Sequence, residues 1–224
     1  MYTKITLLII QTYLISKAIS PPTKNVDTKK VMSIEGLSGI FIARIPKLWN
    51  IFSLIQALVY IFIMFQQELG LIPIFSKRFS ELSEFDIFCF SCTIGGSLLR
   101  LWCYKCLKEF FTFNVTVKKN HRLITTGPYS LLVHPSYIGG ALIPVNYLLL
   151  WYQLYPYIPV YVSSDWYRTL FSSLIWFNVG IQIFFHGMVF FKRIYDEERT
   201  MKKHFGKEWD IYFSERKRFI PFIY

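Results

Sequence analysis

Charged residues are scarce in this sequence. They make up 17% of its 224 residues, against about 25% in a typical soluble domain, while hydrophobic residues make up 53%. The mean hydropathy is +0.35. This balance is too apolar for an ordinary soluble domain, and the chain is long enough for several membrane spans. The composition therefore predicts a polytopic integral membrane protein, in contact with a lipid bilayer.

Acidic residues are the scarcer charge type, with 14 Asp and Glu against 25 Lys and Arg and a formal net charge of +11. A basic balance can indicate nucleic-acid binding. On an apolar chain, however, excess lysine and arginine are more typical of the cytosolic loops that set membrane topology. We therefore predict no nucleic-acid partner.

Cysteine is limited to four residues, Cys89, Cys92, Cys103 and Cys106, which form two C-x-x-C pairs. Such pairs suggest zinc in a soluble protein, but here they fall in an apolar run that predicts a helix. On one helix the first and last cysteines would be about 25 Å apart, at about 1.5 Å per residue, so one metal ion cannot bind all four. We predict packing cysteines and no metal site.

Internal repeats and low-complexity tracts are also missing. Five apolar runs predict an all-α fold with about five transmembrane helices. The runs are Ile5–Ile19, Leu48–Phe65, Phe85–Leu107, Tyr137–Tyr155 and Trp166–Phe191. The first run is short enough to resemble a signal sequence, but Pro21 and Pro22 after the would-be cleavage point favour a retained anchor. Both interpretations stay open.

The stretch from His121 to Gly140 is the one place where polar, turn-forming and titratable residues crowd between apolar segments. Gly127-Pro128 and His134-Pro135 break any helix there, because proline lacks the amide donor. Paired glycines then open the next apolar run and allow close backbone packing. The pattern predicts a loop at the membrane surface that turns back into the bilayer.

Basic residues orient the predicted spans. They gather in the linker between the first two runs, after the third run, and from Lys192 to Arg218, whereas the intervening loops hold Lys77 and Arg78 and little else. The positive-inside rule places the first three segments in the cytosol. The His121–Gly140 stretch and the C-terminal tail should therefore meet on the same side.

The C-terminal tail is the second polar region. Arg193, Glu197 and Met201 share one helix face at i, i+4 and i+8, and Gly206 is a natural stop. A second short helix, about Lys207 to Ser214, would lie on the membrane with Trp209 and Tyr212 inward. From spacing alone, Arg193 and Glu197 read most simply as an exposed i,i+4 pair.

Two motif blocks in these regions resemble the isoprenylcysteine carboxyl methyltransferase family. The first is H-x-L-x-T-x-G-P-Y followed by H-P-S-Y-x-G, and the second is R-x-x-x-E-E-x-x-M-x-x-x-F-G-x-x-W-x-x-Y with a terminal I-P-F-I-Y. The resemblance covers about Phe110 to Tyr224. It implies a catalytic region over 111–224, after membrane spans and a linker over 1–110, with a cytosol-facing pocket for the cofactor S-adenosylmethionine.

The resemblance also implies roles for single residues. The positions around the cofactor are His121, Arg122, Leu123, Ile124, Tyr129, Val133, His134, Pro135, Ser136 and Glu197. Arg193 matches the binder of the substrate carboxylate. Val133 departs from the family, which usually has arginine before the His-Pro pair, although a backbone contact there would survive the change. His134 as a structural residue that caps a turn is the simpler alternative.

The implied reaction methylates the C-terminal carboxyl of prenylated cysteine in proteins, at the endoplasmic reticulum membrane. That carboxylate is already ionised at neutral pH, so the protein needs to align it rather than to supply a catalytic base. Three alternatives stay open. They are a methyltransferase for phospholipids or small lipids, a membrane sterol reductase that uses NADPH and carries a related His-Pro ending, and a degenerate family member without activity.

Overall fold

The computed structural model describes residues 1–20, 37–74, 80–111, 121–145, 153–161 and 164–219. Its helices are α1 (Tyr2–Ile19), α3 (Leu37–Glu68), α4 (Glu84–Leu107), α5 (Pro135–Leu142), α7 (Ile158–Tyr161), α8 (Asp165–Phe205) and α9 (Lys207–Glu215), with single 3-10 turns at Lys108–Phe110, Gly127–Ser130 and Tyr155–Tyr157. Within these ranges the structure contains helices and no strand, so the all-α prediction is confirmed for them.

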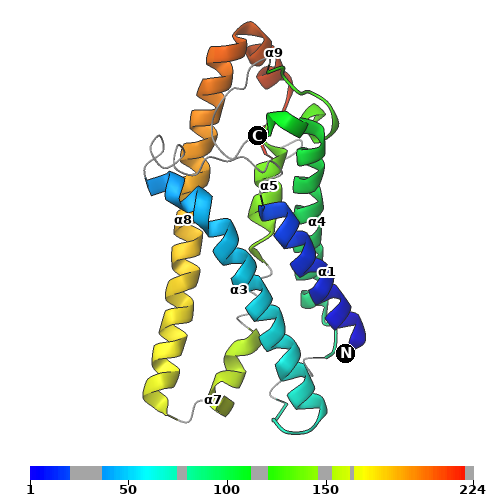
Figure 1. Cartoon of the computed structure of the whole chain (residues 1–224), viewed down its shortest axis with the longest axis vertical. Helices are drawn as coiled ribbons and strands as arrows, with labels where there is room; N and C mark the ends of the chain where they lie inside the picture. Colours follow the sequence, from blue (N-terminus) through cyan, green and yellow to red (C-terminus); the bar gives the residue numbers. More distant parts are fainter. Residues whose placement is uncertain (21–36, 75–79, 112–120, 146–152, 162–163, 220–224) are drawn as a thin grey trace.

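The helices run along one long axis (Figure 1). The first helix, α1, packs against α3 and α4, and α5 packs against α4. The long helix α8 stands on the outside and leads into α9 at one tip of the molecule, while the N-terminus lies toward the other end. The end of α4, the start of α5 and the end of α8 therefore lie in the same half of the molecule.

Two helical stretches are long and apolar enough to cross a membrane, Lys47–Glu68 and Glu84–Phe110. They coincide with the second and third predicted spans. The first and fifth apolar runs are helical as well, within α1 and α8. A count of five spans is nevertheless not confirmed in the described part of the chain, which supports two.

The predicted fourth span differs most from the structure. Instead of a continuous helix from Tyr137 to Tyr155, α5 ends at Leu142, and a turn follows at Ile143 and Pro144. Proline removes an amide donor and clashes with the preceding turn, so the helix stops before it. Thr93 of α4 donates a hydrogen bond at 3.3 Å to the buried Ile143 carbonyl, so this carbonyl in the turn has a partner. Residues 146–152 lie outside the described residues.

A capping box starts α4. The Ser83 hydroxyl accepts from the Asp86 amide at 3.1 Å, and the Asp86 carboxylate accepts from the Ser83 amide at 2.8 Å. The same carboxylate binds Lys4 of α1 at 3.0 Å, where the two side chains are 5% and 2% exposed. This buried ion pair joins the starts of α1 and α4 at the end of the molecule away from α9.

Two glycines set the distance between α4 and α5. A Cβ atom on Gly139 would lie 2.6 Å from the Gly96 carbonyl oxygen, and one on Gly96 would lie 2.8 Å from the Gly139 carbonyl oxygen. Real Cβ atoms do not come so close, so the two helix backbones touch only because neither residue has a side chain. The close packing predicted for the start of this run is present, with Gly96 as the partner.

Helix α8 ends at Gly206, as predicted, and Gly206 adopts the left-handed region at φ 54°. Its amide donates to the Lys202 carbonyl at 3.0 Å. The chain then reverses into α9, whose Trp209 and Tyr212 are buried against protein side chains rather than placed on a membrane. The second helix thus has the predicted extent but a different partner.

Candidate active site

The two polar regions meet through their backbones. The Val133 amide donates to the Lys217 carbonyl at 2.9 Å, and the His134 amide donates to the Arg218 carbonyl at 3.1 Å. Leu132 and Lys217 form a short parallel bridge. The segment after α9 therefore lies along the residues that lead into α5, so that both regions share one end of the bundle, as predicted from charge.

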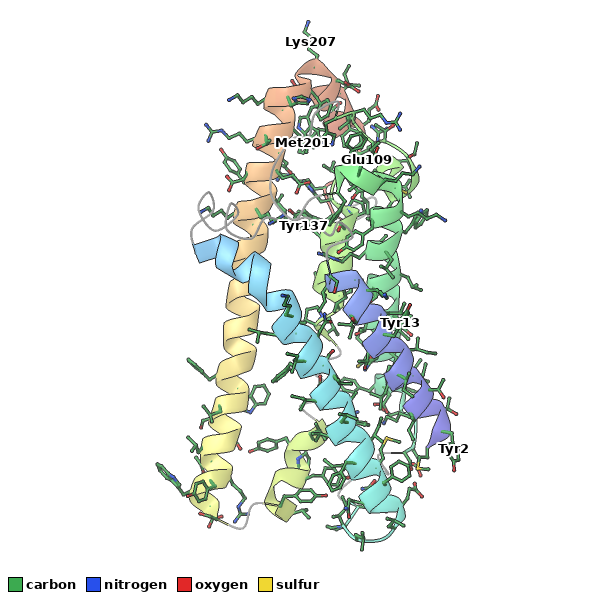
Figure 2. The ribbon with its side chains drawn as sticks, viewed as in Figure 1. Tyr2, Tyr13, Glu109, Tyr137, Met201 and Lys207 are labelled. Atoms are coloured by element: carbon green, nitrogen blue, oxygen red, sulfur yellow. The ribbon has the colours of Figure 1, made fainter. Side chains whose placement is uncertain are left out.

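An aromatic cluster fills the space beneath this contact. Its buried members are Val133, Trp209 and Tyr212, with Leu123, Met201, Phe205 and Phe213 packed around them. The Tyr212 hydroxyl lies within hydrogen-bond distance of two carbonyl oxygens, 3.0 Å from Tyr129 and 3.2 Å from Leu132. Figure 2 shows Met201 of α8 and Tyr137 of α5 on the side of α8 that faces the rest of the molecule, while Lys207 points away at the tip. The cluster ties α8 and α9 to the loop that precedes α5.

His134 and Glu198 form the buried polar centre of the site. The His134 Nε2 and Glu198 Oε1 atoms are 2.9 Å apart, and the two residues are 3% and 9% exposed. Arg218 donates to both oxygens of the same carboxylate through one edge of its guanidinium, with Nε 3.0 Å from Oε1 and one terminal nitrogen on Oε2. Burial alone would raise the pKa of Glu198, but the hydrogen bonds and charges of His134 and Arg218 outweigh it and lower that pKa. Glu198 is therefore ionised at neutral pH, and Nε2 of His134 carries the proton that it donates.

A second chain of hydrogen bonds runs beside it. Arg193 Nε donates to the Tyr137 hydroxyl at 3.1 Å, and that hydroxyl donates to Glu197 Oε2 at 2.6 Å. Arg193 and Glu197 are half-buried on α8, and Tyr137 is half-buried in the first turn of α5. Both α8 side chains therefore bind the same tyrosine of α5. They link two helices, whereas their spacing alone suggested an exposed pair within one helix.

His121 lies at the edge of the site. Its ring stacks on Phe110 with centroids 4.7 Å apart and meets the edge of Phe205 at 5.6 Å. The following turn depends on Gly127, which has φ 63°, and whose Cβ would lie 2.6 Å from the Cys106 sulfur. Tyr129 in the same turn hydrogen-bonds Cys103, and burial raises its pKa well above the ordinary tyrosine value, so its hydroxyl stays neutral.

The predicted site residues are only partly brought together. Those in direct contact with another element of the site are His121, Leu123, Tyr129, Val133, His134, Arg193 and Glu197. Pro135 and Ser136 are buried in the first turn of α5, and Ile124 is half-buried. Arg122 is exposed. Their roles toward a cofactor stay predictions.

His134 and Val133 had simpler structural interpretations, a cap for His134 and a backbone contact for Val133. His134 occupies the position that precedes α5, but its side chain does not cap that helix and instead binds Glu198. Val133 is 4% exposed, and its amide is already taken by Lys217. An arginine side chain at this position would have to enter the aromatic cluster, where Val133 instead makes an apolar contact with α9.

Sequence reasoning missed Glu198, Arg218 and the role of Tyr137. Glu198 follows the predicted Glu197 directly, but adjacent helix positions point about 100° apart, and the i,i+4 spacing to Arg193 singled out Glu197. Arg218 lies beyond the break at Gly206, and no local spacing links it to Glu198. Tyr137 belongs to the quoted H-P-S-Y motif, yet its place at the head of an apolar run assigned it to the membrane.

Among the described residues, no group of three or more His, Cys, Asp or Glu is arranged to hold a metal ion. The four cysteines lie on the single helix α4, where Cys89 and Cys103 are buried and all four are free thiols.

The comparisons with known proteins give one match. Residues 89–173 match the model of the isoprenylcysteine carboxyl methyltransferase (ICMT) family. No curated protein and no solved structure matches the chain. The predicted resemblance to this family is thus confirmed over a range that includes His121 to Gly140. The match and the two apolar helices both favour a membrane protein.

Proposed function

We propose that this chain, with its match to the isoprenylcysteine carboxyl methyltransferase family over residues 89–173, uses S-adenosylmethionine to methylate the C-terminal carboxyl of prenylated cysteine. The observation that carries the proposal is the contact between the matched region and α8, through His134 with Glu198 and Tyr137 with Glu197. The α8 residues lie outside the matched range. The contact of Glu197 and Glu198 with the matched region supports a complete site rather than an incomplete, inactive one.

The side chains present suit the cofactor. A half-buried carboxylate, Glu197, and a half-buried guanidinium, Arg193, lie on one face of α8 beside an aromatic cluster. S-adenosylmethionine carries an amino acid group and ribose hydroxyls at one part and an adenine ring at another, which call for charged and apolar surfaces in turn. In the proposed site Glu197 holds a hydroxyl or amine of the cofactor, and the segments 121–124 and 133–136 surround it.

Arg193 holds the substrate. Its planar fork can bind a carboxylate through two charge-assisted hydrogen bonds, and its Nε is oriented by the Tyr137 hydroxyl. The prenylcysteine carboxylate is ionised at neutral pH and acts as the nucleophile without a base. When bound, the cofactor supplies an electrophilic methyl group on a sulfonium centre. The contribution of the protein is alignment and the exclusion of water, because attraction between opposite charges is stronger in a drier site.

The membrane completes the proposal. A prenyl chain partitions into the bilayer, so a substrate that carries one reaches the site most simply from the lipid phase. The basic residues at the end of the molecule that holds the site favour a cytosolic position for it. From the resemblance to the family we propose the endoplasmic reticulum membrane as its location and prenylated protein C-termini as its partners.

A binding experiment tests the proposal. The purified chain in lipid nanodiscs is titrated with S-adenosylmethionine and, separately, with NADPH, and is then given the methyl donor with N-acylated S-farnesylcysteine, S-geranylgeranylcysteine or a phospholipid amine. Saturable binding of S-adenosylmethionine and base-labile methylation of either prenylcysteine are expected. Binding of NADPH instead would indicate a reductase, methylation of the amine would indicate a lipid methyltransferase, and no binding of either cofactor would indicate a degenerate family member.

Topology gives an independent prediction. In a variant without the native cysteines, Lys207→Cys at the start of α9 should react with a membrane-impermeant maleimide in intact microsomes. Asp165→Cys at the start of α8 should react only after permeabilisation, because α8 is long enough to carry the chain across a bilayer. Both starting side chains are exposed, so each introduced thiol is accessible within its compartment. Labelling of both in intact microsomes would contradict a membrane crossing by α8.

A further inference from the structure

Arg100 is an arginine inside an apolar helix, and the function proposed above does not use it. It lies on α4, within the stretch Glu84–Phe110 that is long and apolar enough to cross a membrane. Charged side chains are costly in such a stretch unless they are paired with other charges or with backbone carbonyls. The groups that Arg100 binds therefore indicate which parts of the fold it connects.

Its guanidinium joins three helices. Nε lies 2.7 Å from the Ala18 carbonyl oxygen at the end of α1 and 2.6 Å from the Tyr104 hydroxyl on α4, and that hydroxyl also donates to the Ala18 carbonyl. One terminal nitrogen donates to the Ser136 carbonyl in the first turn of α5 at 3.3 Å. Arg100 thus connects the last turn of α1, whose carbonyls lack helix partners, to the turn that follows His134.

The close approach of α5 makes this contact feasible. A Cβ on Gly139 would lie 3.2 Å from the Arg100 Cβ, so the glycine brings α5 directly onto the arginine. Helix α5 spans only Pro135–Leu142 and is too short to be stable without tertiary contacts. Its anchors on α4 include the Gly96 contact, the bond from Thr93 to the Ile143 carbonyl, and the bond from Arg100 to the Ser136 carbonyl. The last is the one nearest to His134 and Tyr137.

We propose that Arg100 is a positioning residue for the active site, which fixes the first turn of α5 against the end of α1. In this arrangement Arg100 touches neither cofactor nor substrate. It sets the places of His134 and Tyr137, and through them the pairing with Glu198 and Glu197 on α8. The N-terminal helix, which lies outside the family match, then contributes to the site rather than only to membrane anchoring.

The test compares two breaks between the same pair of helices. Arg100→Met keeps an unbranched apolar stem and removes the guanidinium donors, while Asp86→Asn weakens the buried pair with Lys4 at the other end of α1 and α4. Both variants should unfold at lower temperature than the unchanged protein. Only Arg100→Met should speed hydrogen exchange of the amides of residues 136–140, by tenfold or more, since only it frees the start of α5.

A second readout rests on the proposed function. Arg100→Met should raise the Kd for S-adenosylmethionine about tenfold, whereas Asp86→Asn should leave it within about twofold. Arg100→Lys keeps the charge but cannot reach the Ala18 and Ser136 carbonyls together, so it should give an intermediate exchange rate. If Arg100→Met does not fold, the lysine variant decides by the same two measurements.

The outcomes separate the two proposals. If the unchanged protein does not bind S-adenosylmethionine, the proposed function fails, and the exchange data alone decide on Arg100. Unchanged exchange at 136–140 in the arginine variants, or equal acceleration there in Asp86→Asn, would overturn the positioning role.

Discussion

Arg193→Ala is expected to slow methyl transfer and to raise the KM for prenylcysteine by about thirtyfold to several hundredfold, while Glu197→Ala is expected to raise the Kd for S-adenosylmethionine by a similar factor. Loss of a charged partner from a partly desolvated hydrogen bond costs about 2–4 kcal/mol. An exposed helix pair is worth less than about 0.5 kcal/mol. The two residues face different ligands in the proposed site. The two alanine substitutions should therefore weaken different ligands, and each effect should exceed the loss of an exposed ion pair.

Steady-state kinetics and cofactor titration on the two alanine variants measure this difference. Arg193→Lys retains the charge and loses the fork, so it should recover only part of the KM. Tyr137→Phe is the matched control, because it breaks the hydroxyl bridge between Arg193 and Glu197 without removing either charge. Tyr137→Phe should slightly raise both the KM for prenylcysteine and the Kd for S-adenosylmethionine. Near-normal turnover and binding in both alanine variants would contradict a ligand-binding role for Arg193 and Glu197, and would leave them as a structural pair joined by a tyrosine.

The parts of the fold predicted correctly are those that local sequence determines. A run of apolar residues long enough to cross a bilayer needs no partner to be recognised, and Lys47–Glu68 and Glu84–Phe110 are such runs. The stop at Gly206 is local for the same reason, since a glycine with positive φ ends a helix wherever that helix packs. The asymmetric distribution of charge was enough to predict that the two polar regions lie at one end of the molecule.

The missed features depend on contacts between distant residues or on competing local signals. His134 finds Glu198 across 64 positions, and Arg100 finds Ala18 across 82, and no periodicity encodes such pairs. The apolar run from Tyr137 onward predicted a span from its hydropathy alone. Pro144, a local break signal within the run, lies just after the end of α5 at Leu142. For α9, an amphipathic pattern fits a membrane surface and a protein surface equally, and the structure supplies a protein surface.

Glu198→Gln is expected to give the largest loss of stability among single changes in the site. Its side chain is 11% exposed and joins His134, which precedes α5, to Arg218 after α9, so the neutral amide leaves two buried or half-buried donors poorly matched. Breaking such a pair costs about 2–4 kcal/mol, or a fall in Tm of roughly 5–15 °C for a chain of this size. Glu215→Gln is the matched control, since Glu215 also binds an arginine, Arg216, but its side chain is 60% exposed. That control should shift Tm by less than about 2 °C.

The pH dependence identifies the cause. The pKa of Glu198 is lowered in the folded protein, so its ionised form contributes stability that is complete above the ordinary glutamate pKa of about 4.3 and is lost as the pH falls through the lower folded value. The difference in Tm between the unchanged protein and Glu198→Gln should therefore be larger at neutral pH than below about pH 4.3, where it should shrink as the pH falls. Thermal unfolding in nanodiscs at several pH values and one scan rate measures it. A difference that persists unchanged at the lowest pH would mean that the shape of the glutamine side chain, rather than its lack of charge, destabilises the protein. The ionised Glu198 carboxylate would then not be what holds the two regions together.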